Sequence, residues 1–227
     1  MILLVLIMVG LIVIGMPVAF ALGVGALGAL LTEPSLPLTL VPQRMFTALD
    51  SWPIMAVPLF MLAGGLMDRG GMSRRIVEFA SASLCFIRGS LGMVTVMASM
   101  LFAGISGSST ADTAAVGSIM LPAMRERGYE MRFAAALQAA AGAIGPVIPP
   151  SILMIVIGYV TGTSVAQLFL AGVVPGVLIG TGLMVVAYRQ ALKEGSDFDA
   201  PVPFVGRKAV AAGVRALPAL GLPVPVS

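Results

Sequence analysis

The stretch Gly104-Ile-Ser-Gly-Ser-Ser-Thr110 decides how this chain folds, because it places small and polar residues inside a long apolar segment. Of the 227 residues, 59% are hydrophobic and only 10% are charged, and the mean hydropathy is +1.06. Soluble domains carry about 25% charged residues. Because so few polar side chains cannot cover a surface that faces water, the composition predicts an all-α integral membrane protein.

Apolar runs indicate where the chain crosses the bilayer, since a crossing takes ~20 residues. The first run extends from Ile2 to Leu31 without a charge and predicts one tilted span, and a second span is predicted from Trp52 to Met67. Between them, 32–50 reads as a loop or surface segment. The middle of 68–88 predicts an amphipathic surface helix. Later runs at 133–159 and 175–187 predict a broken span and a last span, joined by an uncharged arm.

The positions of Lys and Arg predict the topology, because these residues accumulate on the cytoplasmic side. Placing 68–88, 125–132 and everything after Tyr188 inside puts twelve of the 13 basic residues in the cytoplasm, and only Arg44 outside. The segment 89–124 must then enter and leave on the same side. Its 36 residues are too few for two crossings, so they predict a re-entrant helical hairpin and a cytoplasmic N-terminus.

Four segments follow from this interpretation. Residues 1–88 hold the N-terminal spans and the surface helix, and residues 89–124 form the hairpin. Residues 125–187 hold the Pro-broken span, the arm and the last span. Residues 188–227 form a cytoplasmic tail and the truncated start of a second repeat.

The hairpin tip offers two kinds of electrostatic environment. The first half-helix is predicted to end near Gly104 or Gly107, where its last carbonyls favour a cation. The second is predicted to start at Ser109, with Asp112 completing a capping box and free N–H groups that favour an anion. The spacing favours Asp112 as a helix cap, and a cation or proton ligand is the alternative.

The segment Gly145-Pro-Val-Ile-Pro-Pro150 predicts a second break at mid-depth. A proline lacks an N–H and leaves the carbonyl four residues earlier without its helical donor. Pro146, Pro149 and Pro150 are therefore predicted to free the carbonyls of Gly142, Gly145 and Pro146. A plain kink is the alternative, but three prolines in five residues favour a real break.

Catalysis is excluded by what the chain lacks. It has no His, so neither a Ser-His pair nor a His-ligated metal site can form. Ser106 therefore lacks a base, and Asp112 lacks the second acid that an aspartyl protease needs. The single Cys85 allows no internal disulfide.

Four motifs, in this order, resemble those of a known transporter family. They are Leu101-Phe-Ala-Gly-Ile-Ser-Gly-Ser-Ser-Thr-Ala-Asp-Thr-Ala-Ala-Val-Gly117, Leu121-Pro-Ala-Met124 with Gly128-Tyr129, Gly145-Pro-Val-Ile-Pro-Pro-Ser151, and Leu168-Phe-Leu-Ala-Gly-Val-Val-Pro-Gly176. Together they are similar to the large membrane subunit of tripartite ATP-independent periplasmic (TRAP) transporters, of the DctM/SiaM type. The resemblance covers nearly the whole chain.

The resemblance implies a Na⁺-coupled importer of organic acids, such as C4-dicarboxylates, in the bacterial inner membrane. It implies two partners, a small membrane subunit and a periplasmic substrate-binding protein, and an elevator mechanism. No cofactor is expected besides Na⁺ as the coupling ion. The Na⁺ candidates are the tip and break residues: Ser106, Gly107, Ser108, Ser109, Gly142, Gly145 and Pro146. The substrate candidates are Ser109, Thr110 and Ser151.

The chain departs from the family in length, since members carry a second, inverted repeat with its own hairpin. We therefore expect the N-terminal half of a permease, either as a truncated product or as one piece of a split permease that needs its missing half. A non-transporting membrane scaffold built from the same half-fold is the alternative.

Overall fold

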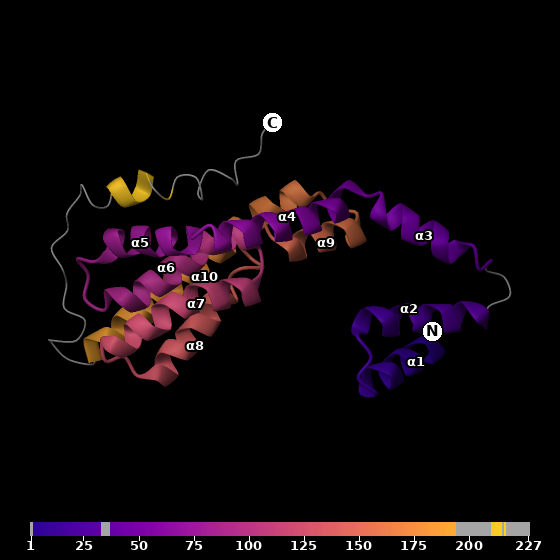
Figure 1. The fold of residues 1–227 in the computed structure, drawn as a ribbon, viewed down its shortest axis with the longest axis horizontal. Helices are drawn as coiled ribbons and strands as arrows, with labels where there is room; N and C mark the ends of the chain where they lie inside the picture. Colours follow the sequence, from indigo (N-terminus) through magenta and orange to yellow (C-terminus); the bar gives the residue numbers. More distant parts are fainter. Residues whose placement is uncertain (1, 33–36, 194–209, 215, 217–227) are drawn as a thin grey trace. The chain divides into compact units, whose positions relative to one another are not determined.

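The structure is a computed structural model that describes residues 2–32, 37–193, 210–214 and 216 (Figure 1). All regular elements in these residues are α-helices, which confirms the predicted all-α class. The chain divides into two compact units, Met1–Trp52 and Pro53–Ser227. The predicted second repeat and most of the tail lie outside the described residues.

The first unit corrects the prediction of a single N-terminal span. Residues 2–31 form two helices that pack against each other, α1 (Ile2–Val13) and α2 (Val18–Leu31). Gly15, with φ of +91°, makes the turn between them, and Pro17 is the N-cap of α2. Each helix has fewer residues than a straight crossing needs. The predicted loop at 32–50 also contains a helix, α3 (Leu40–Leu49).

The second unit contains the remaining named helices. They are α4 (Trp52–Arg69), α5 (Met72–Leu84), α6 (Ser90–Ser106), α7 (Ser109–Glu126), α8 (Met131–Gly142), α9 (Ile152–Thr161) and α10 (Val165–Lys193). The second predicted span is thus α4, and the predicted amphipathic helix is α5. The buried face of α5 carries Ser73, Ile76, Val77 and Ala80, whereas Arg74, Arg75 and Glu78 are exposed.

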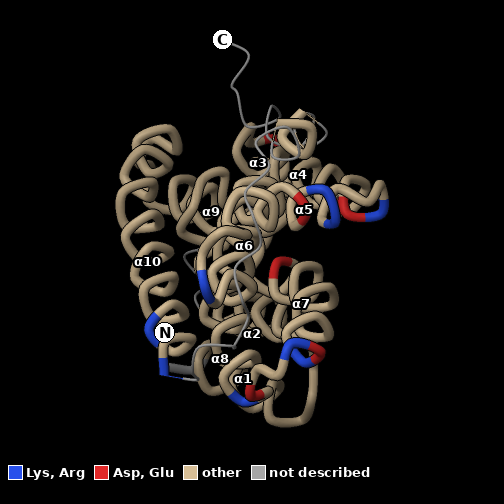
Figure 2. Tube along the Cα trace, turned by 90° about the vertical axis from the view of Figure 1, so that its left-hand side faces the viewer, with Lys and Arg blue, Asp and Glu red and all other residues tan. Residues whose placement is uncertain are grey.

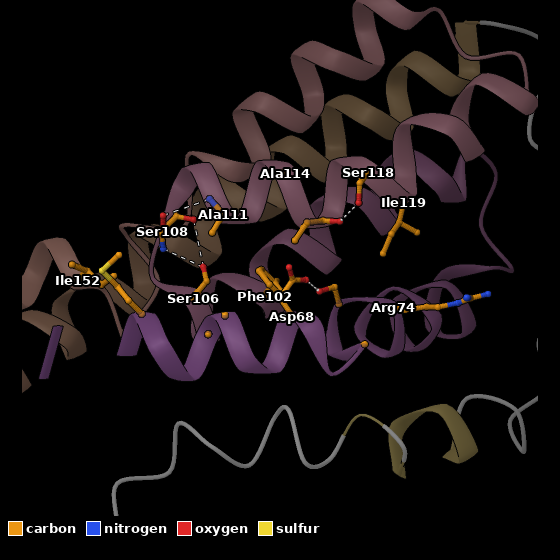
Figure 3. A pocket seen from close by; sticks show the side chains of 16 residues that line it. Asp68, Arg74, Phe102, Ser106, Ser108, Ala111, Ala114, Ser118, Ile119 and Ile152 are labelled. Atoms are coloured by element: carbon orange, nitrogen blue, oxygen red, sulfur yellow. Dashed lines mark hydrogen bonds between the residues drawn. The ribbon is translucent and has the colours of Figure 1, made fainter. Parts of the chain in front are cut away.

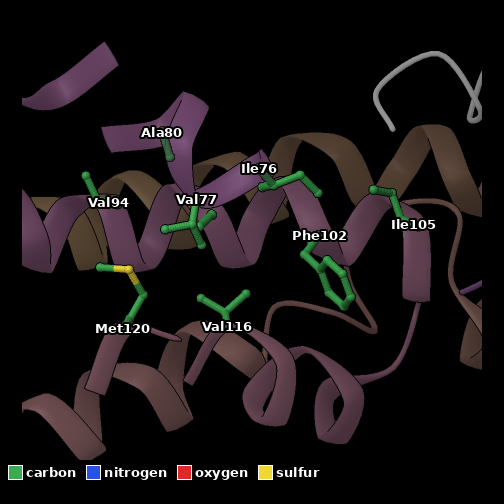
Figure 4. Packing of buried hydrophobic residues seen from close by; sticks show 9 residues of the cluster. Ile76, Val77, Ala80, Val94, Phe102, Ile105, Val116 and Met120 are labelled. Carbon is green, nitrogen blue, oxygen red and sulfur yellow. The ribbon is translucent and has the colours of Figure 1, made fainter. Parts of the chain in front are cut away.

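The centre of this unit is α6, which packs against α5, α7, α8 and α10. One apolar cluster joins α5, α6 and α7 around Phe102, which is 1% exposed, with Ile76 and Met120 (Figure 4). A second cluster joins α6 to α8 and α10 through Val96, Leu137 and Ala187 and neighbouring residues. In lipid, close packing of this kind drives helix association, because the surrounding tails are as apolar as the side chains.

The pair α6 and α7 forms the predicted hairpin. The two helices are in contact and are separated only by Gly107 and Ser108. Their far ends therefore lie together, beside Arg88 and Arg125. At this base the Tyr129 hydroxyl accepts a hydrogen bond from the Gly92 amide, with N and O 3.3 Å apart. Figure 2 shows that charged residues lie mainly near helix ends and in turns. In α7, Asp112 lies in the first turn and Arg125 in the last.

The predicted arm and last span form one continuous helix, α10, of 29 residues with Pro175 inside it. The prediction of a separate arm is therefore wrong. Among the described residues, α10 alone is long and apolar enough to cross a bilayer by itself, and α3 with α4 forms a second candidate. Its glycines Gly172, Gly176 and Gly180 face Met154, Ile148 and Met100, so the missing side chains admit close neighbours.

The hairpin tip packs on the break between α8 and α9. Gly107 has φ of +57°, and a Cβ atom there would lie 2.8 Å from the Pro150 carbonyl oxygen. Gly104 is also close, since its Cβ would lie 3.5 Å from the Pro149 carbonyl oxygen. Two non-helical segments, distant in sequence, therefore support each other.

The hairpin predicts that both of its base turns lie on one side of the membrane. Single cysteines at Arg88→Cys and Arg127→Cys, in a Cys85→Ser background, should react with an impermeant maleimide from the cytoplasmic side of oriented vesicles. Labelling of the two sites from opposite sides contradicts the re-entrant hairpin.

The contact at Gly107 predicts a specific loss of stability. Gly107→Ala should destabilise the folded chain by about 1–3 kcal/mol more than Gly128→Ala, because overpacking adds to the strain of positive φ. Gly128 is the matched control, since it has φ of +82° and no atom within 4 Å of its Cβ position. Thermal unfolding of the detergent-solubilised chains measures the difference. Equal loss in both variants would show that the tip does not depend on this contact.

Candidate functional site

At the hairpin tip, the end of α6 agrees with the prediction, whereas the start of α7 differs from it by one residue. The first half-helix ends at Ser106, and Gly107 is its left-handed C-cap, as predicted. The N-cap of α7 is Ser108, however, and not Ser109. The Ser108 Oγ accepts from the Ala111 amide at 3.5 Å and lies 3.1 Å from the Thr110 Oγ1. Ser108 and Thr110 are therefore engaged with each other at the start of the helix.

Asp112 does not complete the capping box, because the register is shifted by one residue. Its carboxylate instead accepts a hydrogen bond from the Ser106 hydroxyl across the tip. The Ser106 Oγ in turn accepts from the Ser108 amide at 3.1 Å. The prediction of Asp112 as the cap is wrong in this detail, although the residue does lie in the first turn of α7.

The Asp112 side chain is fully buried, and its two oxygens differ. Oδ1 binds Ser106, whereas Oδ2 has no hydrogen-bond partner among the described residues. A buried carboxylate oxygen is costly unless a donor or a cation compensates it. A positively charged ligand would therefore be bound most favourably at Oδ2.

The second break forms where predicted. Helix α8 ends at Gly142, residues 143–150 form turns and bends, and α9 begins at Ile152 with Ser151 as its N-cap. One predicted carbonyl is not free, because the Gly145 amide donates to the Gly142 oxygen at 3.0 Å. Across the described chain, no donor reaches the carbonyl oxygens of Gly145 and Pro146, which agrees with the effect expected of Pro149 and Pro150.

The two breaks meet at Asp112. A Cβ atom at Gly145 would lie 2.5 Å from the Asp112 Oδ2 and 3.1 Å from the Ser109 amide nitrogen. A Cβ atom at Gly142 would collide with the Thr113 hydroxyl and lie 3.2 Å from the Ser109 carbonyl oxygen. Only glycine lets the loop approach so closely, so the sequence places the freed carbonyl segment beside the unpaired carboxylate oxygen.

The substrate candidates lie in three different environments. Thr110 is exposed at the tip, whereas the Ser109 backbone lies against Gly142 and Gly145. Ser151 is fully buried, and its Oγ accepts from the Met154 amide at 3.4 Å, so it serves as a helix cap. Of the three, Thr110 has the most accessible side chain.

The prediction missed two neighbours of this site. The Thr113 Oγ1 donates to the Ser109 carbonyl at 2.8 Å and faces Gly142. Gln138 on α8 is buried, and its amide donates to the Thr113 carbonyl at 3.5 Å. The available signal was the presence of two polar residues, Thr113 and Gln138, within apolar helices; Thr113 faces Gly142, and Gln138 faces Gly117 of α7.

A cavity of about 510 Å³ opens beside the tip (Figure 3). It lies between α4 with the start of α5 on one side and α6 with α7 on the other. Ser106, Ser108 and Ile152 line one end, and Asp68, Ser73 and Arg74 line the other. Its walls are small residues of α4 and α7, including Gly64, Gly65, Ala111 and Ala114. The motifs in the sequence gave no indication of this space, because it joins segments about 40 residues apart.

Comparison with known proteins agrees with the geometry. The family profile described as "Tripartite ATP-independent periplasmic transporter, DctM component" matches residues 5–226. An isethionate TRAP transporter permease of Oleidesulfovibrio alaskensis is 46% identical over 183 residues, covering 81% of this chain and 29% of the relative. The sialic acid TRAP large permease of Vibrio cholerae is 42% identical over 186 residues, covering 82% and 44%.

The C4-dicarboxylate TRAP large permease of Pseudomonas aeruginosa is 46% identical over 164 residues, covering 72% of this chain and 38% of the relative. The chain thus spans less than half the length of these curated relatives. The predicted resemblance is confirmed, and the family is one of membrane transporters and not of enzymes. This chain belongs to the DctM component family of tripartite ATP-independent periplasmic transporters.

Proposed function

We propose that this chain forms the N-terminal half of a Na⁺-coupled permease that imports an organic acid. The observation that carries the proposal is the meeting of the two breaks at the Asp112 Oδ2, which lies beside Gly145 and lacks a hydrogen-bond partner in the described chain. Carboxylate, hydroxyl and carbonyl oxygens are the ligands that hard cations prefer. The set offered here is Asp112, Ser106 and the carbonyls of the broken segment.

The ligand set explains why both breaks are needed. Na⁺ exchanges its hydration shell for several oxygens at once, and the hairpin alone supplies only Ser106 and Asp112. The loop after α8 adds carbonyl oxygens at Gly145 and Pro146 that no described donor uses. Ser108, by contrast, caps α7, so its contribution is to hold the tip.

The substrate and partners follow from the relatives. The relatives named above are permeases for isethionate, sialic acid and C4-dicarboxylates, all of which are organic anions. The proposed permease would take such an anion from a periplasmic binding protein and would assemble with a small membrane subunit. The remaining half of the permease would complete the site, since transporter sites form where two repeats meet. The segments 68–88 and 125–132 would lie in the cytoplasm, as the Arg positions predict.

Ser106→Ala should raise the Na⁺ concentration needed for half-maximal uptake about 5- to 150-fold, because losing one contact of this kind costs ~1–3 kcal/mol. The experiment measures uptake against Na⁺ concentration in a completed permease that carries this half. Ser106→Thr keeps the hydroxyl and should be partly tolerated. Ser108→Ala should change the Na⁺ dependence less, because that hydroxyl caps the helix.

Two further variants sharpen the result. Asp112→Asn removes the charge but keeps the size of the side chain. It should raise the Na⁺ concentration needed for half-maximal uptake at least as much as Ser106→Ala does. Ser83→Ala is the matched control, since its Oγ donates to the Phe79 carbonyl within α5. An unchanged Na⁺ dependence in Ser106→Ala and Asp112→Asn, at normal expression, would place the cation elsewhere.

A further inference from the structure

The cavity beside the tip is the feature that the proposed site leaves unexplained. It runs along α7 from Ser108 to Ser118, which is about 15 Å at 1.5 Å per residue. One end opens on Ser106, whose hydroxyl donates to the Asp112 carboxylate. A ligand that moves through this space therefore reaches the Ser106 hydroxyl, which is one of the proposed cation ligands.

The side-chain oxygens that line the cavity lie toward its two ends. At one end are the hydroxyls of Ser106 and Ser108, at the other are the Asp68 carboxylate and the Ser73 hydroxyl, and Ser118 lies on the α7 wall. The Ser73 hydroxyl donates to the Asp68 Oδ1, which fixes the carboxylate in place. Each end therefore offers oxygen ligands to a partly desolvated cation.

The two charged residues of the lining do not act equally on the cavity. The Asp68 carboxylate points from α4 toward α7, whereas the Arg74 side chain extends along α5 away from Ser106 and Ser108 (Figure 3). The Arg74 side chain is 81% exposed, and its Nε lies 3.6 Å from the Glu78 Oε1. The charge that faces the interior is therefore negative, with Arg74 and Glu78 paired at the outer edge.

We propose that this cavity is the path by which a monovalent cation passes between the hairpin tip and the cytoplasmic side, and that the Asp68 carboxylate concentrates the cation in it. A narrow space with low-dielectric walls and one sign of charge concentrates ions of the opposite sign. Small residues such as Gly64 and Ala114 leave the passage open, and Phe102 contributes an apolar wall. The inference rests on the proposed cation site, because it supplies that site with an access path.

The test measures charge selection inside the cavity with two thiol reagents. Ser118→Cys, in a Cys85→Ser background, places a near-isosteric thiol on the lining. Inverted membrane vesicles that hold the full chain are treated from the cytoplasmic side with cationic 2-(trimethylammonium)ethyl methanethiosulfonate or anionic 2-sulfonatoethyl methanethiosulfonate. Each rate is divided by the rate of the same reagent with 2-mercaptoethanol in solution. The normalised cationic-to-anionic ratio should be about 10, as expected for a carboxylate-lined cleft.

Four variants assign that preference to Asp68. Asp68→Asn keeps the acceptor for Ser73 and should lower the ratio to about 1, whereas Asp68→Glu should retain it. Glu78→Gln removes an exposed acid outside the lining and should change little, and Arg74→Gln should raise the ratio. Glu130→Cys, in the exposed turn before α8, reports that the reagents are active.

Three results would overturn the proposal. A ratio at or below 1 before any change at Asp68 would assign the cavity to an organic anion. A ratio that Asp68→Asn leaves unchanged would remove the role of the carboxylate. No reaction at Ser118→Cys, while Glu130→Cys reacts, would show that the cavity is closed to water. The readout needs no transport, so uptake that proves independent of Na⁺ would remove the proposed coupling and leave this result standing.

Discussion

The need to satisfy polar backbone inside a bilayer governs this structure. Non-helical segments are tolerated at membrane depth only where protein covers them or a wet cavity borders them. Among the described residues of the second unit, Gly107–Ser108 and 143–151 are non-helical, the sequence predicts both at mid-depth, and each packs against the other. Gly104 and Gly107 let the tip approach the carbonyls of Pro149 and Pro150, and Gly142 and Gly145 let the loop approach α7. The rest of the second unit holds these two breaks in register.

The sequence predicted the breaks because glycine and proline act locally. Three prolines after Gly145 lack the N–H that a helix needs, whatever surrounds them. An apolar segment with a polar Gly/Ser centre and arginines at both ends, Arg88 and Arg125, predicts a hairpin without knowledge of its neighbours. Both features are present. The hydrogen-bond register was less predictable, because Ser108 and Ser109 are equally suited to cap a helix. The choice between them moved Asp112 from a capping role to a contact with Ser106.

The failures share a different cause, since they concern contacts between segments distant in sequence. Residues 2–31 carry no charge to mark a turn, so only Gly15 and Pro17 signalled two helices in place of one. Pro175 suggested the start of a span, yet neighbouring helices support a continuous α10 around it. The hydrogen bond between Ser106 and Asp112 joins the two helices of the hairpin, and the cavity beside the tip lies between α4 and α7. Periodicity along one helix contains no information about either.

On the proposed function, Ser106 is the link between ion occupancy and the shape of the tip. Its hydroxyl touches the Asp112 carboxylate and also lines the cavity. A cation at the Asp112 Oδ2 would compensate an oxygen that has no other described partner and would draw the carbonyls of the broken segment toward α7. Without the cation, the buried charge favours separation of the loop from the tip or entry of water. Because binding and conformation are linked, whatever stabilises the closed contact between tip and loop must also tighten cation binding. An anionic substrate held near the start of α7 would do so, which makes coupling a consequence of the two breaks sharing one carboxylate.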